Sequence, residues 1–76
     1  MNDKRRGTLK NALKLLGQAS SLVDGILDQE QDSLDNMPEN LQMSERYEKM
    51  EDAVDSLEDA VSCIDDAKSK IEAALA

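Results

Sequence analysis

Apolar residues in the second half of the chain recur at alternating spacings of four and three residues. The series is Met43, Tyr47, Met50, Val54, Leu57, Val61, Ile64, Lys68, Ile71 and Leu75. Such spacing places every member on one side of a helix, which is the a/d pattern of helices that pack lengthwise against each other. Lys68 is its only charged member. The pattern predicts a helix over residues 44–75, with Ser44 as its N-cap.

Two further rows follow the same seven-residue repeat. Ala53, Ala60, Ala67 and Ala74 stand immediately before the a positions, and Glu51, Glu58, Asp65 and Glu72 fill the opposite flank. Small side chains in a row let a neighbouring helix backbone come close, and the acidic row is typical of a helix face that contacts water.

The first half of the chain predicts a helix over residues 6–34 with a broader apolar arc. One edge of the arc carries Leu15, Leu22 and Ile26, and the other edge carries Leu9, Leu13 and Leu27. One partner helix covers a single edge, since an a/d stripe is narrow. Leu15, Leu22 and Ile26 are therefore the candidate surface for self-association or for a protein partner. Gly17 and Gly25 fall on the polar side, where we interpret them as weak points of the helix.

The connection between the helices is predicted at residues 35–43. Pro38 does not fit inside a helix, and Asn36 with Glu39 suits the start of a short turn over Pro38–Leu41. A connection this short makes the two helices antiparallel neighbours. The fold class is therefore all-α: a single domain, residues 1–76, forming a coiled-coil-like helical hairpin. The uncovered edge predicts a homodimer that forms a four-helix bundle.

The turn also carries a recognisable motif. It runs Asp35, Asn36, Met37, Pro38, Glu39, Asn40, Leu41, Gln42, then Ser44, Glu45 and Arg46, and a basic "KRR" opening precedes the first helix. In these features the chain resembles a family of small helical proteins of Firmicutes genomes, often found within prophages and conjugative elements. The resemblance covers most of the chain and implies a helical hairpin in a mobile-element setting. It implies no particular activity.

Charge is unevenly distributed along the chain. The net charge of the 76 residues is −8, but residues 1–14 carry five basic residues against one acidic residue. Lys4, Arg5, Arg6 and Lys10 form a candidate arm for contacting phosphates. The interpretation we favour pairs this arm with the acidic residues near the end of the second helix, Asp65, Asp66 and Glu72. The acidity of the remaining chain disfavours nucleic-acid binding, and Asp24 and Asp28 disfavour a membrane-bound face.

Candidate chemistry is sparse. The chain has no His, and Cys63 is its only cysteine. A metal site or a catalytic thiol would need a histidine or a second cysteine nearby, so the sequence predicts neither. We expect no catalytic residues, no cofactor and no metal. Glu30 falls within the apolar arc, where it either pairs with Arg46 or Lys49 across the turn or reaches solvent.

These observations favour a non-enzymatic protein that binds another protein through helical surfaces. Two alternatives stay open: a nucleic-acid accessory protein that uses the basic arm, and an acidic DNA mimic that uses the carboxylate rows. The unpaired cysteine and the lack of a long apolar run predict a cytoplasmic location.

Overall fold

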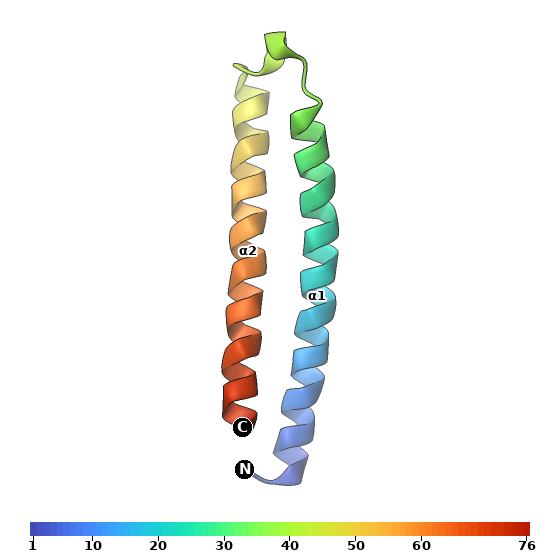
Figure 1. The fold of residues 1–76 in the computed structure, drawn as a ribbon, viewed down its shortest axis with the longest axis vertical. Coiled ribbons are helices and arrows are strands. Elements are labelled where there is room, and N and C mark those ends of the chain that lie inside the picture. Colours follow the sequence, from blue (N-terminus) through green and yellow to red (C-terminus); the bar gives the residue numbers. More distant parts are fainter.

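The computed structural model describes all 76 residues and consists of two long helices joined by a short connection (Figure 1). Helix α1 spans Asp3–Asp35, the 3-10 helix η1 spans Glu39–Leu41, and α2 spans Glu45–Leu75. The two helices pack antiparallel in a rod of 60 × 15 × 14 Å. This confirms the all-α class and the helical hairpin.

Helix α1 is capped at both ends by asparagine. The Asn2 side chain accepts a hydrogen bond from the Arg5 backbone N–H at 2.8 Å, so the helix begins three residues before the expected start at residue 6. At the other end, the Asn36 amide donates to the carbonyl of Asp32 at 2.8 Å. The prediction that Asn36 caps the short turn was wrong. Its side chain instead donates a second hydrogen bond to the Asp32 carbonyl, which also accepts from the Asn36 backbone N–H at 3.1 Å.

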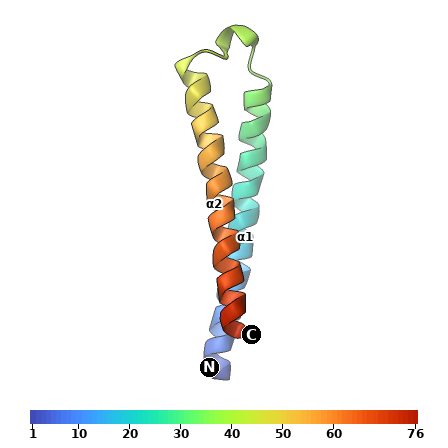
Figure 2. The ribbon, with the colours of Figure 1, turned by 60° about the vertical axis from the view of Figure 1, so that its left-hand side comes forward.

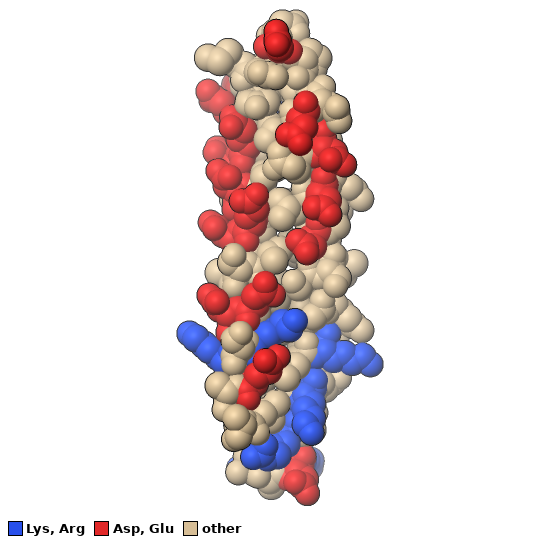
Figure 3. All heavy atoms as spheres, viewed as in Figure 1, with Lys and Arg blue, Asp and Glu red and all other residues tan.

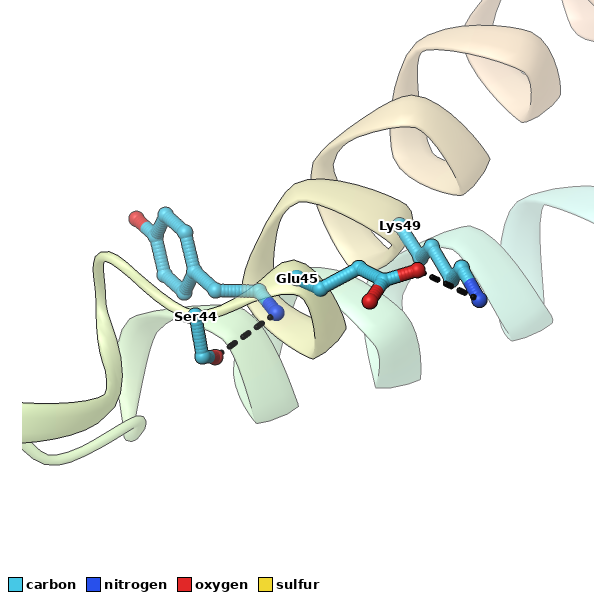
Figure 4. A network of polar contacts seen from close by, with 4 residues as sticks. Ser44, Glu45 and Lys49 are labelled. Atoms are coloured by element: carbon cyan, nitrogen blue, oxygen red, sulfur yellow. Dashed lines mark hydrogen bonds and ion pairs between the residues drawn. The ribbon is translucent and has the colours of Figure 1, made fainter.

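Ser44 closes the connection and begins α2, as predicted. Its hydroxyl oxygen accepts from the Tyr47 backbone N–H at 3.2 Å and donates to the Leu41 carbonyl at 2.6 Å. Glu45, the first residue of α2, forms an ion pair at 3.3 Å with Lys49, which lies one turn later on the surface (Figure 4). The N-cap therefore links the last turn of the connection to the first turn of α2.

The contact between the helices is a continuous seam of half-buried side chains. On α1 the seam consists of Arg6, Leu9, Leu13, Leu16, Ser20, Val23, Leu27, Glu30 and Leu34; on α2 it consists of Tyr47, Met50, Val54, Leu57, Val61, Ile64, Lys68, Ile71 and Leu75. Both series alternate spacings of three and four residues, as coiled-coil packing requires. Val54 is the only residue that is fully buried, at 4% exposure. A single two-helix seam therefore leaves nearly every side chain in contact with water.

Two expectations about the seam were wrong. Met43 is 92% exposed because it precedes the N-cap of α2 and lies in the connection. Gly17 does not face solvent on the polar side. A Cβ atom placed on it would lie 4.0 Å from the Lys68 Nζ atom, so Gly17 stands beside the one lysine of the α2 seam. This distance is an ordinary van der Waals contact, so an alanine would also fit at this position.

The two termini are tied together at the open end of the hairpin. The Arg6 guanidinium on α1 donates a hydrogen bond to the Leu75 carbonyl at the end of α2. The last carbonyls of a helix lack intrahelical partners and carry partial negative charge, which a guanidinium stabilises. In a second view, turned by 60°, the two helices overlap near this end and lie side by side near the turn, so they are inclined to each other (Figure 2).

Candidate interaction surface

Helix α1 carries a second apolar stripe outside the seam. Its members are Ala12, Leu15, Ala19, Leu22 and Ile26, again at alternating spacings of three and four residues. Leu15 is 56% exposed, Leu22 74% and Ile26 50%. Three large aliphatic side chains of one helix therefore lie in water, although their spacing would fit a second packed helix.

Helix α2 contributes a matching row of small residues, namely Ala53, Ser56, Ala60, Cys63 and Ala67. In each helix the row lies on the same flank of the seam, since Ala19 and Ala60 both stand four residues before a seam residue. Two antiparallel helices of equal heptad phase are related by a two-fold axis perpendicular to the plane of the hairpin. The corresponding flanks of α1 and α2 consequently lie on the same face of the hairpin. We call the second stripe of α1 and the small-residue row of α2 together the apolar face.

Solvent exposure agrees with this placement. Ala12 and Ala19 of α1 and Ala60 and Ala67 of α2 are half-buried, as expected of residues next to the seam. Cys63 is exposed. The apolar face is thus a shallow surface with large side chains along α1 and small ones along α2.

The apolar face contains no acidic residue. The chain has 17 Asp and Glu residues, and all of them lie outside the ten positions of this face. When the same heptad positions are followed toward the ends of the rod, the only charged residues met are basic: Arg5, Arg46, Lys49 and Lys70. Excluding every carboxylate from one side of a chain of net charge −8 favours burial of that side rather than exposure to water.

The total surface is larger than a chain of this mass normally exposes. The accessible surface is 5700 Å², whereas a compact protein of 8.4 kDa exposes roughly 4,600 Å². The excess is roughly 1,100 Å², and one partner of a standard protein interface buries about 800 Å². The hairpin therefore has enough surplus surface for one further partner.

Basic residues gather at the end of the rod that holds both termini (Figure 3). Residues 1–14 and 70–76 contain six basic residues against two acidic ones, a net charge of +4, and we call them the basic end. Residues 15–69 contain three basic residues against fifteen acidic ones, a net charge of −12. The sequence reasoning identified only the α1 part of this cluster, because Lys70 joins it through the antiparallel fold.

The expected pairing of the basic arm with Asp65, Asp66 and Glu72 was wrong. No ion pair within 4.0 Å joins them, and the single ion pair of the molecule links Lys49 and Glu45. Arg6 is half-buried and engaged with Leu75, whereas Lys4, Arg5 and Lys10 are exposed. The arm thus separates into one residue that ties the hairpin and three that face solvent.

The remaining candidate groups are Glu30 and the possible metal ligands. Glu30 is half-buried and lines a shallow depression with Arg46 and Lys49, but it forms no ion pair with either residue. No group of three or more potential metal ligands occurs in the structure. Neither helix is both long enough and apolar enough to cross a bilayer.

Taken together, the seam and the exposed stripe define an antiparallel helical hairpin with one unpaired apolar face. Comparisons with protein-family models, with curated proteins and with solved structures found no match.

Proposed function

We propose that this protein is a non-enzymatic interaction module that binds protein through its apolar face, and that it self-associates through this face into a four-helix bundle. The observation that carries the proposal is the exposure of Leu15, Leu22 and Ile26 on a side free of carboxylates. Burial of these side chains contributes about 25 cal/mol per Å² of apolar surface removed from water. A domain of this size has few other sources of stability.

The four-helix bundle follows from the geometry of the apolar face. Two hairpins placed face to face bring each large stripe into contact with a partner helix, and the two seams then border a shared core. Four helices around one core is a recurrent solution for helices with apolar arcs wider than a two-helix seam. The acidic rows remain on the outside, where they keep the assembly in solution.

Sedimentation velocity on a matched pair of variants tests this proposal. Leu22→Asp places a carboxylate at the centre of the apolar face. Ser21→Asp places one at the neighbouring exposed position, which lies on the opposite side of the rod. We expect Ser21→Asp to sediment as the unmodified dimer, and Leu22→Asp to sediment as a monomer or to unfold. A helical dimer for Leu22→Asp would contradict the proposed interface.

The basic end supports a second candidate, an accessory role with a polyanion such as nucleic acid. Its specific support is the clustering of Lys4, Arg5, Lys10 and Lys70 at one end of the rod. Binding of this kind weakens with salt, because each phosphate contact releases counterions. Fluorescence anisotropy with labelled duplex DNA at low salt tests it. We expect Lys4→Gln combined with Arg5→Gln to abolish binding, while absence of binding by the unmodified chain would exclude this role.

A further inference from the structure

We propose that the second copy on the apolar face runs in the opposite direction, so that the turn of one hairpin lies beside the termini of the other. This inference rests on the self-association proposed above and specifies its direction. In this arrangement α1 packs against α1 of the second copy, and α2 packs against its α2. The alternative places both turns at the same end and pairs each α1 with the α2 of the second copy.

Charge distribution favours the opposite direction. The basic end carries +4, and residues 15–69 carry −12. Two copies aligned in the same direction set the two acidic stretches side by side along their whole length, and the two basic ends side by side as well. Reversing one copy moves each basic end next to the turn half of the other hairpin. This replaces like-charge neighbours with opposite ones at both ends, and such complementarity sets orientation at interfaces.

The second stripe of α1 is complementary to itself in the reversed direction. Antiparallel heptad packing sets residues of the two stripe positions across from each other in alternation. With the two-fold axis midway between Leu15 and Ile26, Ala19 lies across from Leu22 of the second copy, and Leu15 lies across from its Ile26. Small and large side chains thus alternate at the centre of the contact, which is the pattern that fills space between two helices.

The same axis fits the small-residue row of α2. The Arg6–Leu75 hydrogen bond and the proximity of Gly17 to Lys68 fix the level of each helix against the other. They place the centre of the α1 stripe level with about residue 63 of α2, at a rise of about 1.5 Å per residue. Reversal about that level sets Ala60 across from Ala67 of the second copy. The two α2 helices then meet through alanines, which allow a close approach.

The position of the apolar face along the rod supports full overlap. The α1 stripe spans residues 12–26 of a helix that runs from Asp3 to Asp35, so its centre lies near the middle of the helix. A copy reversed about this centre covers nearly the whole length of the first. A stripe confined to one end would leave half of each reversed hairpin uncovered.

Distance measurements between spin labels on separate copies test the direction. Labels are attached at Asn40→Cys in the connection or at Ala76→Cys at the C-terminus, both exposed and both outside the apolar face. Both variants carry Cys63→Ala, which removes the only native thiol and keeps this position of the apolar face small and apolar. The unmodified protein without a label serves as the control for the mass of the assembly, and the unlabelled Cys63→Ala protein is compared with it.

Pulsed electron paramagnetic resonance on two samples, one with a single label position and one a mixture, determines the relative direction of the two copies. We expect copies labelled at Asn40→Cys to show separations near the 60 Å length of the rod. We expect copies labelled at Asn40→Cys mixed with copies labelled at Ala76→Cys to show much shorter ones. The reverse result, with the two Asn40→Cys labels close together, would overturn the direction while leaving self-association intact. A monomeric mass for the unlabelled control would overturn the self-association itself, and the direction with it.

Discussion

The two apolar stripes of α1 follow the same rule of spacing but have different surroundings. The inner stripe, from Leu9 to Leu34, is the α1 side of the seam and is covered by α2. The outer stripe is the second apolar stripe, from Ala12 to Ile26, in which Leu22 is 74% exposed. A hairpin supplies one neighbouring helix for each helix, so it covers one apolar stripe of α1 and leaves the other exposed to water. The comparison shows that an a/d pattern predicts packing but does not name the partner: α2 covers the inner stripe, whereas no part of this chain covers the outer one.

Disrupting the inner stripe has the largest expected effect. Val54→Asp puts a carboxylate at the only fully buried position of the chain. A small domain has about 3–5 kcal/mol of stability, and an unpaired buried charge removes most or all of that. We expect far-ultraviolet circular dichroism to show loss of the helical signal. A fully helical Val54→Asp protein would mean that the seam contributes little to the fold.

Adjacent leucines allow the two stripes to be compared directly. Leu16 belongs to the inner stripe and Leu15 to the outer one. We expect Leu16→Ala to lower the free energy of unfolding by about 2 kcal/mol at every protein concentration. For Leu15→Ala we expect a loss below about 0.5 kcal/mol in dilute solution and a larger loss at concentrations where the dimer forms.

Urea denaturation of both alanine variants at two protein concentrations measures these losses. The change in each loss with protein concentration distinguishes the two stripes, because only a contact between two copies becomes more stabilising as the protein concentration rises. Equal losses for Leu15→Ala at both concentrations would place the outer stripe outside any interface.

A substitution at the N-cap of α2 distinguishes an effect on folding from an effect on association. Ser44→Ala removes the acceptor for the Tyr47 N–H without touching the outer stripe. We expect it to cost about 1 kcal/mol in the free energy of unfolding, measured by thermal denaturation. The dissociation constant of the folded dimer should stay the same, and a large change in that constant would mean that the connection takes part in the interface.

Gly25 provides the smallest of these effects. A Cβ atom added there meets no other atom within 4 Å, and the residue lies in the interior of α1. We expect Gly25→Ala to raise the free energy of unfolding by up to about 1 kcal/mol, measured in urea. A loss of stability would indicate that a neighbouring copy approaches the α1 backbone at this point.

The sequence predicted the elements well because each is fixed by local rules. The spacing of apolar residues predicted both helices, the short connection marked by Pro38 predicted their antiparallel packing, and Ser44 was the expected N-cap. The seam of α2 was correct except for Met43, whose spacing continued the pattern although the helix begins only after Ser44. Periodicity alone does not detect the end of a helix, which depends on backbone hydrogen bonds at the cap.

Apart from the local errors at Asn36 and Met43, the errors concern contacts between distant residues. Gly17 was assigned to the polar side, but the coiled-coil register brings it beside Lys68. The basic arm was expected to pair with carboxylates of α2, yet Arg6 binds the backbone carbonyl of Leu75 instead. Exposed ion pairs contribute little free energy, so sequence complementarity there does not determine which contact forms.

The candidate surface was predicted only in part. Leu15, Leu22 and Ile26 were identified from the width of the α1 arc, but the α2 half of the face was not. Ser56 and Cys63 are unremarkable in isolation, and they join the face only because the two helices run in opposite directions. The exclusion of acidic residues from both stripes was the available signal, and it becomes visible once the heptad positions of the two helices are compared.

We expect a second copy of the chain to cover the outer stripe of α1 in solution. Light scattering after size exclusion, over a series of protein concentrations, tests it most directly. A mass near twice 8.4 kDa that falls toward 8.4 kDa only on strong dilution is the predicted result. A helical protein that remains at 8.4 kDa across the series would contradict the claim and would leave the apolar face open to a different protein.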